Sequence, residues 1–163
     1  MAEENQAAAA DTQAPQGQFG IQKVYVKDLS FETPYSPAVF TEEWKPTVNL
    51  QLANEARKIA DNTHEVVLRV TVTVTAADKT VYLAEINQAG IFHINGFPDD
   101  VIKRMVATIC PNILFPFARE LLSDLATRGG FPQLLLAPVN FEAIYAQQQQ
   151  QQAQEDGASA TTH

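Results

Sequence analysis

The sequence lacks the features that disulfide-stabilised, nucleic-acid-binding and membrane-bound proteins usually carry. Its single cysteine, Cys110, excludes an intrachain disulfide, which is typical of a protein of the reducing cytosol. Lys and Arg number 11 against 19 Asp and Glu, and no run of basic residues forms a stripe. The chain therefore has no surface suited to neutralising nucleic-acid phosphates, and an anionic membrane is an equally poor partner.

Targeting and membrane-spanning signals are absent as well. No segment approaches the roughly 20 consecutive apolar residues of a transmembrane helix. The first residues, Met-Ala-Glu-Glu-Asn, have neither the basic nor the apolar region of a secretory signal. We expect a soluble, cytosolic protein with one domain, because 163 residues that are 45% apolar can supply one core.

No catalytic or metal-binding constellation is visible. The sequence has no Gly-x-Ser-x-Gly elbow, no Gly-rich phosphate loop and no metal-ligand spacing. His64 and His93 fall in or beside expected strands, where a lone histidine is more often structural than catalytic. Cys110 has no acid or histidine partner nearby in sequence, which favours a buried structural thiol. We therefore predict no enzymatic activity, no cofactor and no metal.

The middle of the chain carries a strong strand pattern. Apolar side chains recur at every second position from Val66 to Val74, with Arg69 and threonines between them. We expect strands at residues 22–30, 47–52, 66–75 and 82–94. A short hairpin at 76–79 should join the last two, and Gly90 marks a bulge or a close packing point. The proline-rich segment 32–46 should be an extended loop with a heavy load of aromatic residues.

Helices are expected after the strands. A short one covers 98–106, and the main one begins between Pro111 and Pro116 and ends at Gly129-Gly130. A third starts at the cap residue Asn140. The main helix is apolar around more of its circumference than a surface helix needs, so we expect self-association. The predicted class is α+β, with a four-stranded antiparallel sheet, a long helix and a C-terminal helix.

Three segments outside these elements stand out. The loop that follows the main helix contains Phe131, Leu134, Leu135, Leu136 and Val139, although loops normally lie in solvent. These residues either complete the core, which composition alone favours, or form a binding surface. Residues 1–17 and 153–163 are too poor in apolar side chains to fold, so both are expected to be disordered tails around a domain at 18–152.

Four segments of the chain carry a family resemblance. They read QKVYVKDLSFETP at 22–34, YLAEINQAGIF at 82–92, CPNILFPFARE at 110–120 and FPQLLLAPVNF at 131–141. Together they closely resemble the SecB family of protein-export chaperones. The resemblance runs in order from about residue 19 to residue 145. It implies a homotetramer, a dimer of dimers in which two eight-stranded sheets enclose the long helices. It also implies a holdase that binds unfolded precursor proteins and delivers them to the SecA ATPase, which supplies the energy. An alternative within the family is a SecB-like chaperone dedicated to a toxin–antitoxin system.

The resemblance also assigns roles to individual positions. SecA binding falls on Asp28, Glu32, Leu83 and Glu85, and tetramer assembly on Ala84, Ile86 and Gln88. In residues 83–88 these two roles have opposite parity, so each would occupy its own face of one strand. The client-binding groove would contain Phe40, Trp44, Leu50, Leu52, Phe92, Phe117 and Tyr145. Two positions depart from the family pattern, because some relatives have Cys at Ala84 and Tyr is common at Phe117.

Overall fold

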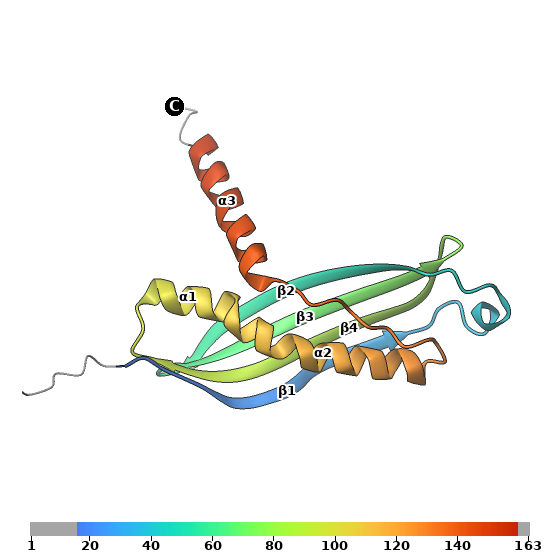
Figure 1. The fold of residues 1–163 in the computed structure, drawn as a ribbon, viewed down its shortest axis with the longest axis horizontal. Coiled ribbons are helices and arrows are strands. Elements are labelled where there is room, and N and C mark those ends of the chain that lie inside the picture. Colours follow the sequence, from blue (N-terminus) through green and yellow to red (C-terminus); the bar gives the residue numbers. More distant parts are fainter. Residues whose placement is uncertain (1–15, 160–163) are drawn as a thin grey trace, which may run out of the picture.

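The computed structural model describes residues 16–159, which form a curved four-stranded sheet with helices on one side (Figure 1). The strands are β1 (Gln18–Glu32), β2 (Thr47–Ala60), β3 (Thr63–Ala76) and β4 (Lys79–Asn95). All neighbours pair antiparallel, in the order β1-β4-β3-β2. The expected sheet is confirmed. β2 extends beyond Leu52 because the polar residues that follow pair with β3 through their backbone, which the side-chain pattern does not reveal.

Tight turns join the three strands β2, β3 and β4. Ala77 and Asp78 form the expected β3–β4 turn, with φ angles of 50° and 59°. Positive φ at both central residues is the geometry that matches the twist of a hairpin. The β2–β3 turn contains Asn62, with φ of 54°. The segment between β1 and β2 differs from the extended loop that we expected, because it contains a short 3-10 helix at Ala38–Thr41.

A long helix, bent at Thr108, lies along the sheet. Its parts are α1 (Asp99–Ala107) and α2 (Ile109–Arg128), and α2 contacts β4 and β3. α2 begins before Pro111 rather than after it, because a proline in the first turn gives up only an N–H that has no helical partner. The helix ends at Gly129-Gly130 as expected, and Gly130 adopts a φ of 88°.

The core lies between α2 and one face of the sheet, which we call the inner face. It contains the even-numbered residues of β3 from Val66 to Val74 and of β4 from Tyr82 to Ile94. Leu114, Ala118 and Leu122 of α2 cover them and are fully buried. The stretch Asp99–Arg128 is long and apolar enough to cross a membrane, a test that core helices of soluble proteins also pass. Within residues 16–159, no helix covers the opposite, outer face of the sheet (Figure 1).

The last helix, α3 (Phe141–Ser159), points away from the sheet (Figure 1). Its expected cap is confirmed, since the Ala143 backbone N–H donates to Asn140 Oδ1 at 3.0 Å. From Ala146 to Gly157 its residues are exposed all around. α3 also continues past residue 152, where we expected the folded domain to end. Residues 1–15 and 160–163 of the expected tails lie outside the described residues.

Candidate functional site

Asp28, Glu32, Leu83 and Glu85 lie together on the outer face, and we call them the acidic patch. Glu32 of β1 is directly opposite Leu83 of β4, and Ser30 is opposite Glu85. Asp28 and Glu32 are exposed, whereas Leu83 and Glu85 are partly buried by their neighbours. The strand register thus brings two residues of β1 and two of β4, which are about 50 residues apart in sequence, onto one open surface.

A β-bulge in β1 determines that Asp28 belongs to this surface. Val26 pairs with Gln88 on the inner face, Asp28 pairs with Asn87 on the outer face, and Lys27 is the extra residue between them. Because side chains alternate along a strand, the extra residue switches the face on which even-numbered residues lie. The sequence does carry this signal, since the apolar positions change from Val24 and Val26 to odd-numbered ones, but we did not interpret it.

A buried carboxylate, Glu65, lies on the outer face beside the acidic patch. It is only 4% exposed, and Lys27 Nζ donates to its two oxygens at 3.0 and 3.1 Å. Arg57 Nε donates at 2.6 Å, and the Tyr25 hydroxyl donates as well. The Tyr25 hydrogen bond first, and then those from Lys27 and Arg57, lower the pKa of Glu65 to about 2 against the effect of burial. Burial and the Glu65 carboxylate raise the pKa of Tyr25 to about 12.

Sequence reasoning missed this cluster, because its members come from three strands and share no local spacing. Tyr25 and Lys27 lie on β1 and Arg57 on β2, the two edge strands of the sheet. The β1 side chains reach Glu65 of β3 across β4, where Ala89 lies opposite Tyr25 and is fully buried. A small residue at that position leaves room for the crossing.

Ala84, Ile86 and Gln88 point to the inner face, as their parity predicts. Ala84 and Ile86 are fully buried, and Gln88 is 3% exposed. The Gln88 amide donates to the Tyr25 backbone carbonyl at 3.0 Å. All three therefore lie in the core of this chain.

Part of the expected client groove is an aromatic cluster around Phe131. Phe40 and Trp44 stack on Phe131, with ring centroids 5.3 and 5.6 Å away, and Tyr82 packs on it at 4.8 Å. Phe131 is 5% exposed, whereas Phe40 is 52% exposed. The segment between β1 and β2 therefore presents an aromatic surface at the end of α2, and buried core residues support this surface.

The remaining expected groove residues lie apart from this cluster. Leu52 and Tyr145 line a cavity of about 150 Å³ between β2 and α3, and Leu50 lies farther along β2 and is partly buried against the core. Phe117 lines a separate groove between α2 and β1 and is 46% exposed. Phe92 is fully buried and stacks on Phe19, with centroids 5.8 Å apart. Phe92 is thus a core residue in this chain, with no surface accessible to a client.

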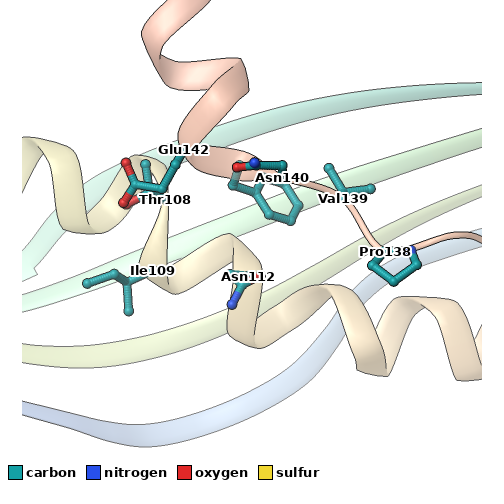
Figure 2. A pocket seen from close by; sticks show the side chains of 8 residues that line it. Thr108, Ile109, Asn112, Pro138, Val139, Asn140 and Glu142 are labelled. Carbon is teal, nitrogen blue, oxygen red and sulfur yellow. The ribbon is translucent and has the colours of Figure 1, made fainter.

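The apolar loop after α2 is partly buried in the core and partly exposed. Phe131 and Leu136 are buried, and Leu134 is partly buried, whereas Leu135 is 72% exposed. Farther along, the loop borders a groove of about 360 Å³ at the bend between α1 and α2 (Figure 2). The groove is lined by Thr108, Ile109, Asn112, Pro138, Val139, Asn140, Phe141 and Glu142.

Of the reactive side chains that the sequence singled out, Cys110 is fully buried, and His64 and His93 are partly buried. Burial raises the pKa of the Cys110 thiol to about 12, so the thiol stays protonated at neutral pH. Burial and the nearby Lys58 lower the pKa of His64, and its buried Nδ1 has no hydrogen-bond partner within residues 16–159. In the described part of the chain, no three His, Cys, Asp or Glu residues are close enough to hold a metal ion.

Comparisons with known proteins agree with this geometry. The family model "Preprotein translocase subunit SecB" matches residues 12–152. The "Protein-export protein SecB" of Nitrosococcus oceani is 56% identical over 165 aligned residues, and that of Methylococcus capsulatus is 52% identical over 163. Both alignments cover all of each chain. Among solved structures, a SecB-like chaperone of Mycobacterium tuberculosis, in complex with a peptide from an antitoxin, has a TM-score of 0.63. It is 18% identical and covers 75% of this chain and 91% of its own. By the family model and these full-length relatives, the chain belongs to the SecB family of protein-export chaperones.

Proposed function

We propose that this protein is a cytosolic, ATP-independent holdase that binds unfolded precursor proteins and passes them to SecA. The proposal is supported by the names and full-length identity of the relatives, and above all by the exposed apolar side chains on the helix-covered side. Phe40, Phe117 and Leu135 are between 46% and 72% exposed there. Apolar burial at about 25 cal/mol per Å² would give affinity with little sequence preference, which suits a chaperone with many clients.

A homotetramer, built as a dimer of dimers, would cover part of this side. α2 uses one face to cover the sheet, yet Ile109 and Phe117 remain exposed on its other surfaces. Inner-face side chains of β1 are exposed too, among them Ile21 and Val26. Apolar surface of this extent favours association with further copies of the chain. Ala84, Ile86 and Gln88 would contribute by fixing the position of α2.

The acidic patch is the proposed docking site for a basic segment of SecA. Carboxylates on an open sheet face attract a basic partner and orient it at low salt. We expect that Glu85→Lys weakens SecA binding at least about tenfold, because it removes attraction and adds repulsion. Asp61→Lys is a matched control, since Asp61 is exposed in the β2–β3 turn and its replacement introduces the same change of charge outside the patch. Equal effects of the two variants would contradict docking at this patch.

Service to a toxin–antitoxin pair is not favoured. The chaperone of Mycobacterium tuberculosis that carries an antitoxin peptide is only 18% identical, so its likeness supports the fold and not the client. The relatives with 52% to 56% identity are named as protein-export proteins.

Client binding can be tested by light scattering from a secretory precursor diluted out of denaturant without nucleotide. A severalfold excess of the protein should suppress aggregation. Phe40→Ala should weaken client binding about three- to tenfold, because the change removes an aromatic side chain of which about half is exposed to a client. As a control, Thr41→Ala should leave client binding unchanged, because Thr41 is the exposed neighbour of Phe40 but offers little apolar surface. Aggregation as fast with the wild-type protein as without it would refute the holdase.

A further inference from the structure

The β1 bulge creates an electrostatic problem next to the acidic patch. It places Lys27 directly beside Asp28, and both lie on the outer face. An unrestrained lysine at this position could pair with Asp28 and remove a negative charge from the surface proposed for a basic partner. Across residues 16–159, however, the Asp28 carboxylate takes part in no ion pair or side-chain hydrogen bond, and Lys27 is bound to Glu65 instead.

Glu65 is well placed to keep Lys27 there. Its side chain is 5% exposed and is held from other directions by Arg57 and Tyr25, so its oxygens are fixed before Lys27 binds. Charge-assisted hydrogen bonds to a fixed, buried carboxylate are stronger than those to an exposed carboxylate that must be ordered. Lys27 itself is 43% exposed, so it would be free to move if Glu65 did not hold it.

We infer that Glu65 is a positioning residue for the acidic patch: it holds the Lys27 ammonium group away from Asp28 and thereby leaves Asp28 free to bind a basic partner. This inference rests on the proposed docking of SecA. Glu65 does not contact the partner, but acts by removing a competitor from within the chain. A buried carboxylate on the outer face would therefore influence the exposed acidic patch through the position of Lys27.

The test uses Glu65→Gln, which keeps the size and polarity of the side chain but removes its charge. Lys27 should then pair with Asp28, and SecA should bind up to about fivefold more weakly, as expected for the loss of one exposed charge pair. The double variant Glu65→Gln with Lys27→Met should bind within about twofold of the wild type, because the competitor is gone.

A second double variant separates this effect from net charge. Lys23 lies on the outer face of β1, opposite Ile91, and forms no ion pair with the described residues. Glu65→Gln with Lys23→Met has the same net charge as the first double variant but keeps Lys27. It should stay as weak as Glu65→Gln. Equal recovery in both double variants, or in neither while all remain folded by circular dichroism, would overturn the inference.

A crystal structure of the Glu65→Gln variant tests the inference without SecA. It should show Lys27 Nζ within about 4 Å of the Asp28 carboxylate, the usual limit of an ion pair. Lys27 pointing elsewhere would refute the inference even if SecA docks at the patch. Failure of the wild-type protein to bind SecA would instead remove the docking proposal, with the Lys27–Asp28 pairing still decided by the crystal structure.

Discussion

The inner and outer faces of the sheet are made by alternate residues of the same strands, yet they differ in almost every physical respect. On β4, Ile86 is fully buried under α2, while its neighbour Glu85 is partly exposed on the outer face. On β3, Val70 is buried and Arg69 is exposed. The inner face is selected for packing. The acidic patch contributes little to packing, which fits its proposed role as a docking surface.

The inner side differs further because it leaves large apolar side chains exposed. α2 covers the centre of the sheet, but Ile109 and Phe117 remain exposed on the helix, and Leu29 on the flanking strand. On the outer face, the most buried charged group, Glu65, is fully satisfied within the chain. The inner side therefore fits the proposed association with further copies of the chain, and the open outer face fits the proposed docking of SecA.

The largest effect that separates the faces should come from Ile86→Ala. The side chain is fully buried against α2, so the change removes packed methyl groups and should cost about 2–4 kcal/mol of unfolding free energy. Urea denaturation measures this loss. The matched outer-face change is Leu83→Ala, which should cost clearly less because Leu83 is only partly buried. Similar losses in both variants would show that the outer face is covered as well.

The next effect concerns pH and Glu65. Its pKa is lowered from 4.5 to about 2 in the folded protein, so its stabilising interactions are complete above pH 4.5 and disappear as pH falls through 2. Between pH 5 and pH 2 the wild type should lose on the order of 2 kcal/mol that the Glu65→Gln variant does not lose. Thermal unfolding of both proteins across this range gives the difference. Parallel curves would mean that the carboxylate is not held by Lys27, Arg57 and Tyr25.

A smaller effect is expected from Gly90→Ala on the inner face. A Cβ at this position would lie 2.7 Å from the Phe92 ring and 3.0 Å from Leu114 Cδ2, which is too close without local movement. The crowding should cost about 1–2 kcal/mol, near the lower end for overpacked cores. Urea denaturation should show the loss. Ala89→Gly provides the comparison on the outer face, because it removes a methyl group one residue away, whereas Gly90→Ala adds one. An unchanged midpoint in Gly90→Ala would indicate looser packing under α2.

The smallest effect on stability should come from Glu85→Ala. Its only ionic partner among residues 16–159 is Arg69, 3.9 Å away, and both side chains are at least 40% exposed. Such a pair contributes less than about 0.5 kcal/mol, so the unfolding midpoint should hardly move. SecA affinity should nevertheless fall. A large loss of stability would make Glu85 a structural residue and weaken the case for docking.

Much of the secondary structure and of the assignment of residues to sheet faces can be predicted from the sequence, because both follow from local patterns. Alternating valines define β3, the Gly129-Gly130 pair ends α2, and Asn140 caps α3. Parity alone separates Ile86 from Glu85. These features depend on neighbours a few residues apart, which a sequence displays directly.

Other features depend on pairing between distant segments and could not be predicted in this way. β2 continues to Ala60 because β3 supplies backbone partners for polar residues that have little strand preference of their own. The Glu65 cluster requires the register of all four strands, because β1 reaches β3 only across β4. Phe92 was expected in the client groove, but buried and binding aromatic residues have the same sequence signature. The exposed surfaces of α2 likewise suggest partners without revealing their arrangement.

The central claim is that the inner side of the sheet is completed by other copies of the chain, while the outer face stays open. Multi-angle light scattering of the purified protein tests it most directly. We predict a mass near four times the 17.9 kDa of one chain. The same mass is expected for Glu85→Lys, which alters only the outer face. A single-chain mass at all concentrations, or loss of the assembly in Glu85→Lys, would contradict the account.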